Sequence, residues 1–376
     1  MIPFNQPAFL GNETLYIKDV IDNRMFCGNQ KYTQKCNTWF KKTLKCSNAI
    51  LVSSCTHALE IAALLLNIKK GDEIIMPSFT FVSTANAFAL RGAKCVFIDI
   101  RPDTMNINEN LIEKAITKRT KAIVVMHYGG ISCNMDKIMN IAQKHNIYVI
   151  EDAAQAMMAK YKNNFLGTIG DIGTYSFHET KNYTCGEGGL LIINNDKFSN
   201  RAEIIRDKGT NRMSFHRGEV DKYTWVDLGS SYIVSELNAA YLYGQLQKAD
   251  QINQNRINIW NNYYEELLPL KEKGLIELPF IPSKCSHNAH LFYIKVRDNQ
   301  QQTDLIKYLN NHNIMAVFHY IPLHSSYAGK KYGHFYGKDY YTTKESKRLV
   351  RLPFYYGLSF DDRKYITNTI KTFFKD

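Results

Sequence analysis

The sequence lacks any apolar run of the roughly 18 to 20 residues that a helix needs to cross a bilayer. Residues 1–7 lack the basic and apolar regions of a secretory signal peptide. There is no C-x-x-C pair, and Cys27, Cys36, Cys46 and Cys55 lie too far apart for a zinc knuckle. We therefore expect a cytoplasmic protein without a membrane span or a metal site, whose 8 cysteines are reduced thiols that mostly pack in the interior.

Basic residues are not concentrated in any one segment, although the formal net charge is +12. No run of five or more basic residues occurs, and no RNA-binding motif with interleaved aromatic residues is present. We expect most lysines to lie on a solvated surface and no nucleic-acid partner, while an anionic small substrate would be attracted modestly. No G-x-G-x-x-G follows the first predicted strand, which argues against a nicotinamide dehydrogenase.

Short apolar runs alternate with helix-forming segments through the first half of the 376 residues. Strands are predicted at 49–52, 73–76, 94–98, 122–127, 147–150 and 190–193. Helices are predicted at 12–23, 36–46, 58–66, 81–90, 109–116, 135–145 and 201–208. Because such alternation is typical of βαβ units, we predict an α/β fold with a mostly parallel sheet covered on both faces.

The second half of the chain predicts a long connection and a smaller α+β part. Residues 209–231 form a polar segment of a length that is usually functional or part of an interface. A long helix is predicted from 235 to about 268, where Pro269 would end it. Beyond it, strands are predicted at 291–296 and 314–318, and helices at 303–310, 343–350 and 361–374.

Polar residues follow several predicted strands. Asp152 ends one strand in VIEDAAQ, and Ser53–Thr56 end another before a helix whose free N–H groups suit a phosphate, although Ser and Thr are also ordinary helix caps. Lys181 lies in a glycine-flanked loop, SFHETKNYTCGEGG. Ligands of parallel sheets gather at such strand ends. A lysine for a Schiff base and an aspartate for the pyridine nitrogen together predict a pyridoxal phosphate site.

Six motifs in order resemble those of the sugar-nucleotide aminotransferases, and the match covers nearly the whole chain. The motifs are SSCT (53–56), PSFTFVST (77–84), EDAAQA (151–156), SFHETKN (176–182), GEGG (186–189) and HYIPLH (319–324). The resemblance implies an aspartate aminotransferase-like fold, with a large cofactor-binding domain at 1–245 and a smaller C-terminal α+β domain at 246–376. It also implies a homodimer that builds its active sites at the two-fold interface.

The resemblance assigns roles around the cofactor ring. Lys181 would carry pyridoxal 5'-phosphate as a Schiff base, and Asp152 would keep the pyridine nitrogen protonated so that the ring acts as an electron sink. Gln155 would reach the ring hydroxyl, and Phe81 occupies the position of an aromatic ring over the cofactor face.

The resemblance likewise assigns the phosphate to Cys55, Thr56 and Ser176. This chain departs from the family at two of its binding positions. The family usually has Gly where Cys55 stands, which bears on how closely the backbone approaches the phosphate. It usually has Asn where Ser231 stands, a residue that reaches the phosphate bound by the partner subunit.

Four residues are candidates for the substrate side of the site, namely His178, Glu187, His319 and Tyr320. We expect His319 to be hydrogen-bonded within the protein, because no carboxylate or cysteine lies at metal-binding spacing from it.

Segments 208–212, 220–225 and 315–320 further resemble the branch of the family that forms dTDP-4-amino-4,6-dideoxygalactose for enterobacterial common antigen. The reaction implied is transfer of an amino group from L-glutamate to the 4-keto carbon of dTDP-4-keto-6-deoxyglucose, with Lys181 as general base and acid. An equatorial (gluco) product, or another nucleotide-linked ketosugar, stays open. A pyridoxamine-dependent dehydratase would lack Lys181, and a non-catalytic sugar-nucleotide binding protein would not need Lys181, Asp152 and Gln155.

Overall fold

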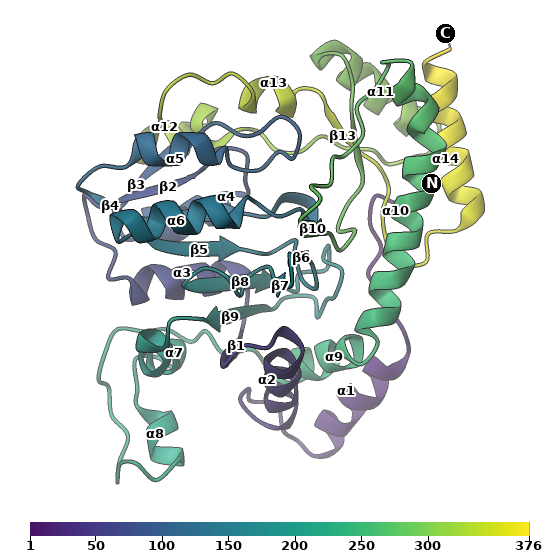
Figure 1. Cartoon of the computed structure of the whole chain (residues 1–376). Helices are drawn as coiled ribbons and strands as arrows, with labels where there is room; N and C mark the ends of the chain where they lie inside the picture. Colours follow the sequence, from purple (N-terminus) through teal and green to yellow (C-terminus); the bar gives the residue numbers. More distant parts are fainter. Residues whose placement is uncertain (376) are drawn as a thin grey trace.

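The computed structural model describes residues 1–375, and its centre is an eight-stranded sheet (Figure 1). The strand order is β1-β9-β8-β5-β4-β2-β3-β12. Their bounds are β1 Asn48–Val52, β2 Glu73–Pro77, β3 Lys94–Ile98, β4 Thr120–Met126, β5 Tyr148–Asp152, β8 Ile172–Ser176, β9 Gly189–Ile193 and β12 Gly333–Phe335. Neighbours from β8 to β12 pair in parallel, and β9 is antiparallel to both of its neighbours. The prediction of an α/β fold with a mostly parallel sheet is confirmed.

Helices lie on both faces of this sheet, in the regions where they were predicted (Figure 1). They are α2 Lys31–Leu44, α3 Cys55–Leu65, α4 Val82–Ala89, α5 Glu109–Ala115, α6 Met135–His145 and α7 Ser199–Arg206. The predicted first helix, α1 Asn12–Asp22, packs against a later helix, α9 (Glu236–Leu246), instead. Alternate residues of a strand point to opposite faces. In β1, Ala49 and Leu51 join one core cluster, while Ile50 and Val52 join another. Burial on both faces explains why these strands are continuous apolar runs.

The connection between the two halves differs from the predicted single helix 235–268. It consists of α9 Glu236–Leu246 and α10 Ala249–Glu272, with Lys248 in a non-helical conformation between them. Pro269 lies inside α10 instead of ending it. Leu270, the next residue, is buried in the C-terminal core, and this burial offsets the backbone hydrogen bond that proline cannot donate.

Two other C-terminal predictions are wrong. Residues 314–318 form no strand in the described chain, only two isolated bridges. Ile314 pairs with Ile2, and Val317 pairs with Arg351. The predicted helix 343–350 is a short helix, α13 Thr342–Ser346, followed by β13 Leu349–Arg351. This segment is extended because Val350 pairs with Ile294 of β11, Tyr293–Lys295, and both side chains are buried in one cluster. Helices α11 Asn299–Asn311 and α14 Phe360–Phe373 correspond to predicted ones.

Several elements had no predicted counterpart. They are β8, β12, α8 Arg212–His216, α12 Tyr327–Tyr332, β6 Lys160–Tyr161, β7 Asn164–Phe165 and β10 Cys285–Ser286, with 3₁₀ turns at Tyr128–Gly130, Asp196–Phe198 and Leu323–Ser325. In β8, Gly173 interrupts the apolar pattern. A Cβ there would lie only 1.9 Å from the carbonyl oxygen of Gly167, so the backbone approach requires glycine.

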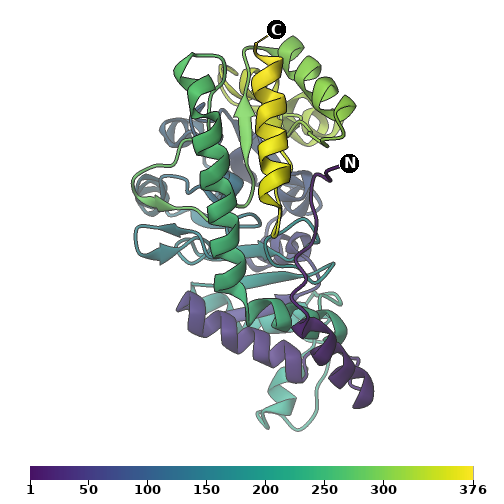
Figure 2. The same cartoon turned by 90° about the vertical axis from the view of Figure 1, so that its right-hand side faces the viewer.

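The C-terminal part has its own core, in which α10 and α14 lie side by side (Figure 2). Its segments also return to the rest of the chain. Strand β12 pairs in parallel with β3 at the edge of the large sheet, and Ile2 at the N-terminus pairs with Ile314. The division into domains at 1–245 and 246–376 stays a prediction, and both of these contacts cross it.

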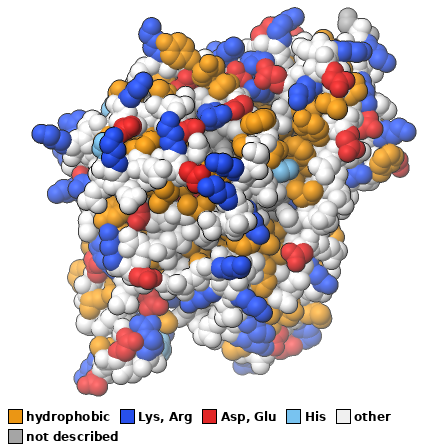
Figure 3. Space-filling model, viewed as in Figure 1, with side chains coloured by type: hydrophobic (Ala, Val, Ile, Leu, Met, Phe, Trp, Pro, Cys, Tyr) orange, Lys and Arg blue, Asp and Glu red, His pale blue; other side chains and the backbone are white. Residues whose placement is uncertain are grey.

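The face of the molecule in Figure 3 carries lysine and arginine side chains at many separate places, mixed with acidic ones. Among residues 1–375, no helix is both long and apolar enough to span a membrane. The cytoplasmic location stays a prediction. All eight cysteines have free thiols; five of them are buried, and Cys27 is exposed.

A buried carboxylate joins α9 to the start of α2. Glu236 accepts hydrogen bonds from the backbone N–H groups of Gln30, Tyr32 and Thr33 at 3.0, 2.6 and 3.1 Å, and from the Thr33 hydroxyl. These donors lie at a helix N-terminus, where a negative charge is favoured. The change Glu236→Ala is therefore expected to lower the free energy of unfolding by about 3 kcal/mol in urea titrations. Glu272→Ala, at an exposed position on α10, is the control and should change it little; an equal loss in both would contradict this role.

Candidate active site

One cavity of about 350 Å³ collects nearly all of the predicted site residues. It lies at the carboxyl ends of the central strands, since Met126, Asp152 and Ser176 are the last residues of β4, β5 and β8. The predicted residues that line it are Cys55, Thr56, Phe81, Asp152, Gln155, Ser176, His178, Lys181, Glu187, His319 and Tyr320. The chain therefore brings residues from distant motifs to one edge of the sheet, as expected for a parallel sheet.

Asp152 is a buried carboxylate at the floor of this cavity. Its Oδ2 accepts a hydrogen bond from Thr84 Oγ1 at 2.6 Å, and its Oδ1 accepts one from the backbone N–H of Ala154 at 3.2 Å. Burial raises the pKa of the Asp152 carboxyl, while these hydrogen bonds oppose the rise. A protonated ring nitrogen placed against the carboxylate would compensate its buried charge, so this residue fits the pyridine nitrogen of the cofactor.

Lys181 projects into the same cavity from the loop between β8 and β9. The loop is closed by two hydrogen bonds, from Glu179 N–H to Gly186 O and from Cys185 N–H to Phe177 O. Gly186 has φ +77°, a conformation that favours glycine. Burial is the main reason that the pKa of the Lys181 ammonium is lowered. A lysine with a lowered pKa holds more of the neutral amine that reacts with a carbonyl carbon.

The start of α3 forms a cradle of hydrogen-bond donors. Ser54 caps the helix by accepting from the His57 N–H at 3.1 Å, and the first-turn N–H groups at Cys55 and Thr56 have no acceptor within the helix. A Cβ on Gly189 would lie 2.3 Å from the carbonyl carbon of Ser54, so the close approach of β9 to the start of α3 requires glycine at this position. With the Ser176 hydroxyl on the same cavity, these donors fit a phosphate group.

Gln155 and Tyr320 are linked at the cavity wall. Gln155 Nε2 donates to Tyr320 Oη at 3.0 Å, and Gln155 Oε1 accepts from the Gly129 N–H at 2.7 Å. The Phe81 ring, which is 53% exposed, lies 6.2 Å from the Tyr320 ring. The assignment of Gln155 to a ring hydroxyl and of Phe81 to a ring face stays a prediction.

The remaining candidates occupy two parts of the cavity. His178 and Glu187 approach to 3.7 Å, and both side chains are partly exposed. His319 is half-buried, with Nδ1 at 2.9 Å from Tyr128 Oη and Nε2 at 3.3 Å from Arg351 Nη1. Burial holds the pKa of the His319 imidazole well below its usual range, so the ring is neutral at neutral pH. Within residues 1–375, no group of three or more His, Cys, Asp or Glu side chains is arranged to hold a metal ion.

Sequence reasoning missed several polar residues of this site, among them Ser83, Thr180 and the three that follow. Thr84 bonds Asp152, His290 bonds Asn182 through Nδ1 at 2.8 Å, and Arg351 contacts His319. Thr84 lies inside a motif that had been identified, so its hydroxyl was an available signal. Arg351 follows two apolar residues, directly after the segment 343–350 that was predicted to be helical, and nothing in that pattern pointed to a ligand.

Ser231 is the one predicted site residue that does not line this cavity. It borders a separate hollow with Cys27, Gly28 and Arg212. Ser231 therefore does not contribute to the cavity that holds Lys181 of the same chain. Its contact with the phosphate bound by a partner subunit stays a prediction.

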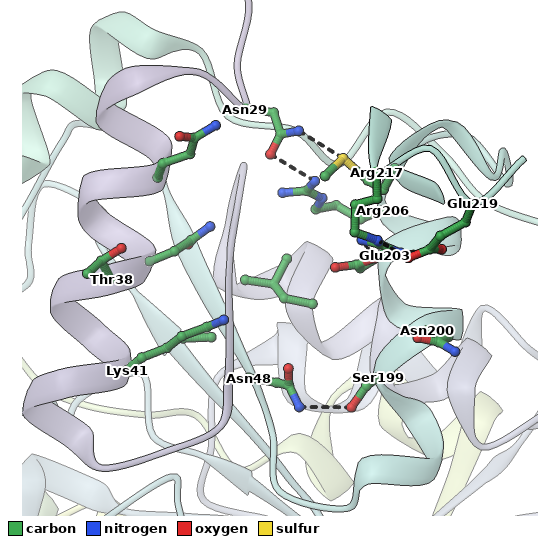
Figure 4. Close-up of a pocket in the computed structure, with 15 residues that line it drawn as sticks. Asn29, Thr38, Lys41, Asn48, Ser199, Asn200, Glu203, Arg206, Arg217 and Glu219 are labelled. Atoms are coloured by element: carbon green, nitrogen blue, oxygen red, sulfur yellow. Dashed lines mark hydrogen bonds and ion pairs between the residues drawn. The ribbon is translucent and has the colours of Figure 1, made fainter. Parts of the chain in front are cut away.

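A larger polar hollow, of about 810 Å³, lies between α2 and the α7–α8 segment (Figure 4). Asn29 accepts from Arg206 at 3.1 Å, and Asn48 donates to the Ser199 hydroxyl at 2.9 Å. Arg206 is buried, and its Nε has no hydrogen-bond partner within residues 1–375. None of the predicted site residues reaches this hollow.

Comparison with known proteins places this geometry in a family. Residues 10–371 match the DegT/DnrJ/EryC1/StrS aminotransferase family. Protein MJ1066 of Methanocaldococcus jannaschii, which is uncharacterized, is 36% identical over 90% of this chain and 89% of its own length. The spore coat polysaccharide biosynthesis protein SpsC of Bacillus subtilis is 30% identical over 100% of this chain and 97% of its own.

Solved structures agree with the fold. The aminotransferase TlmJ from Streptoalloteichus hindustanus superposes with a TM-score of 0.91 and 26% identity, covering 99% of this chain and 98% of its own. Spr1654 from Streptococcus pneumoniae, solved in its pyridoxal phosphate form, has a TM-score of 0.88 and 23% identity, covering 99% of this chain and 98% of its own. The prediction of an aspartate aminotransferase-like fold is confirmed.

The family match also identifies the cofactor and the class of reaction. Aminotransferases of this family use pyridoxal phosphate, so that prediction is confirmed, and the lysine, the buried carboxylate and the donor cradle fit it. Since the match spans nearly the whole sequence, the protein is a transaminase. The chain belongs to the DegT/DnrJ/EryC1/StrS aminotransferase family.

Proposed function

We propose that this enzyme transfers an amino group from L-glutamate to the 4-keto carbon of dTDP-4-keto-6-deoxyglucose, forming dTDP-4-amino-4,6-dideoxygalactose for a cell-surface polysaccharide. The observation that carries the proposal is the convergence of Lys181 and Asp152 on one cavity with a phosphate cradle. The name of SpsC, a protein of spore coat polysaccharide biosynthesis, supports a polysaccharide precursor as the product. Spr1654, named as a sugar aminotransferase, supports a sugar substrate.

The chain supplies positioning, charge and proton transfer. Bound pyridoxal phosphate supplies a ring that withdraws electrons from the carbon bearing the amino group. Asp152 would hold the ring nitrogen protonated through its buried charge, and Thr84 fixes the carboxylate by hydrogen bonding. The Lys181 amine would take the proton from the donor carbon that bears the amino group and would return it to the cofactor carbon on the other side of the nitrogen. The start of α3 and Ser176, which line the same cavity as Lys181, would hold the phosphate and so orient the cofactor toward the lysine.

The nature of the sugar is tested by product analysis. The enzyme is incubated with L-glutamate and dTDP-4-keto-6-deoxyglucose, and the configuration at C-4 of the product is solved by NMR. An axial amino group is the expected result. An equatorial amino group would replace the proposed product by the gluco isomer, and absence of any amination would overturn the proposed substrate.

We further propose a homodimer with shared active sites. Residues 209–231 stand away from the sheet with α8 (Figure 1), and bridges between Asp207 and Ser231 and between Thr210 and Trp225 hold the segment together. Its apolar side chains are exposed in the single chain, with Trp225 at 72% and Leu228 at 53%. A second copy that covers them would supply its Ser231 to this site.

The change Trp225→Arg is expected to weaken the dimer at least about 10-fold, because a large aromatic side chain at an interface contributes strongly to binding. Sedimentation equilibrium and light scattering would measure it. Tyr327→Arg is the control, since Tyr327 is 84% exposed on α12, outside the 209–231 segment. A strictly monomeric wild-type protein with full activity would rule out the dimer.

A further inference from the structure

The polar hollow between α2 and the α7–α8 segment lies apart from the cofactor cavity (Figure 4). Among residues 1–375, the two share no lining residue. Residues 34–41 of α2 line one side of the hollow, Ser199–Arg206 of α7 line the other, and residues 48–50 of β1 lie between them. Its volume of about 810 Å³ falls in the range of sites that hold a small molecule.

Arg206 is a buried cation that lines this hollow, with 3% of its surface exposed. Its Nη2 donates to Asn29 Oδ1 at 3.1 Å, whereas its Nε has no hydrogen-bond partner within residues 1–375. Burial lowers the pKa of the Arg206 guanidinium, but an arginine keeps its proton in proteins. A buried charge without a bonded counter-charge is costly, so this position favours the entry of an anion.

The carboxylates close to this guanidinium are engaged by other cations. Glu203 pairs with Arg217 at 2.8 Å, and Glu219 pairs with the same arginine at 2.6 Å. Asp207 borders a separate hollow and pairs with Lys208 at 2.9 Å. Within residues 1–375, none of these carboxylates forms an ion pair with the buried guanidinium.

Lys41 brings a further cation from the opposite side of the hollow. Its side chain extends from α2 into the hollow (Figure 4), and it forms no ion pair within residues 1–375. The hollow is lined by three cationic side chains and two carboxylates, so its excess charge is positive. A negatively charged ligand is therefore attracted to it.

The uncharged lining groups suit the hydroxyl groups of a sugar. The side chains of Gln34, Thr38 and Asn200 form no hydrogen bond within residues 1–375. Asn37 accepts from the Leu51 N–H through Oδ1 at 2.9 Å, which leaves its Nδ2 as a donor. No aromatic side chain is among the described residues of the hollow, so a nucleobase would find no ring to stack on.

We propose that this hollow binds a phosphorylated sugar, with its phosphate on Arg206 and its hydroxyl groups on the amide side chains of α2 and α7. A guanidinium suits a phosphate because its planar fork can donate two parallel hydrogen bonds, and the ammonium of Lys41 adds attraction. The site goes beyond the proposed transaminase reaction and does not depend on it. A bound ligand would join α2 to α7, and α7 leads into the 209–231 segment.

Calorimetric titration with glucose 1-phosphate and glucose 6-phosphate tests the proposal. The pyridoxal phosphate-loaded enzyme is used, so that the phosphate cradle at α3 is already filled. At least one of the two sugar phosphates is expected to bind, about 10-fold or more tightly than inorganic phosphate or glucose. Arg206→Gln should raise its dissociation constant at least about 10-fold, and Lys41→Gln about 2- to 5-fold. If Arg206→Gln fails to fold, Lys41→Gln decides by the same measurement.

Two controls locate the bound sugar phosphate. Lys42→Gln, at an exposed position of α2 outside the hollow, and Arg351→Gln, in the cofactor cavity, should leave the dissociation constant unchanged. A loss in Arg351→Gln without a loss in Arg206→Gln would place the ligand in the cofactor cavity and overturn the proposal. Wild-type enzyme that binds neither sugar phosphate would also overturn it. A change of oligomeric state in Arg206→Gln without any ligand binding would assign the hollow to a second copy of the chain instead.

Discussion

Lys181→Ala is expected to abolish turnover and the visible absorbance that a lysine-linked pyridoxal group gives. Among residues 1–375, Lys181 is the one lysine that lines the cavity, and burial lowers the pKa of its ammonium, so no other lysine of this part can replace its amine there. Both the covalent attachment and the proton transfer depend on the same Nζ atom. The loss should therefore reach the limit of detection, measured by amino-group transfer and by an absorbance scan of the cofactor-loaded protein.

The control for this change is Lys271→Ala, at an exposed position near the end of α10. It should keep both the absorbance and the turnover of the wild-type protein. Retained turnover in Lys181→Ala would contradict the assignment of Lys181 as the catalytic lysine. A wild-type protein that never acquires the absorbance would point instead to a binding protein.

Asp152→Asn is expected to lower kcat about 100- to 1,000-fold while keeping the visible absorbance. Asparagine can accept the Thr84 hydrogen bond, but it carries no charge to hold a proton on the ring nitrogen. Removing one preorganised electrostatic interaction in a buried site typically has an effect of this size. Steady-state kinetics would measure kcat, and a pH titration of the cofactor absorbance would show the ring nitrogen losing its proton more readily.

Asp171→Asn is the matched control for Asp152→Asn. Asp171 accepts from the Val149 N–H at 2.9 Å, at the other end of β5 from Asp152, and it does not line the cavity. Its replacement should reduce stability without a comparable fall in kcat. A value of kcat in Asp152→Asn within about twofold of the wild-type value would contradict the role of the carboxylate.

The central strands could be predicted because burial on both faces requires an unbroken apolar run, as in Ile74–Met76. Strand β12 could not, because Gly333, His334 and Phe335 have no apolar pattern, and the segment is extended only where it meets β3. The segment 343–350 was wrongly predicted to be helical for a similar reason. Its C-terminal end is extended because it pairs with β11, and local sequence does not encode that contact.

Some residues of the site could likewise be predicted from the sequence, and others could not. Lys181, Asp152 and Ser176 follow apolar runs within recognisable motifs, and the structure brings them together in one cavity. Arg351 lies in no such motif. It reaches the cavity because its backbone pairs with Tyr293 and Val317, contacts that form only once residues far apart in the sequence are folded together.

The pairing of β12 with β3 has a consequence for synthesis. Strand β3 is complete at Ile98, but the strand that covers its edge begins at Gly333, so the ribosome adds more than about 200 residues in between. At 5–20 residues per second this takes roughly 10 to 50 s. During that time the apolar edge of β3 is open to pairing with another chain. A strand made more than about 200 residues after β3 thus protects the edge of that strand from aggregation.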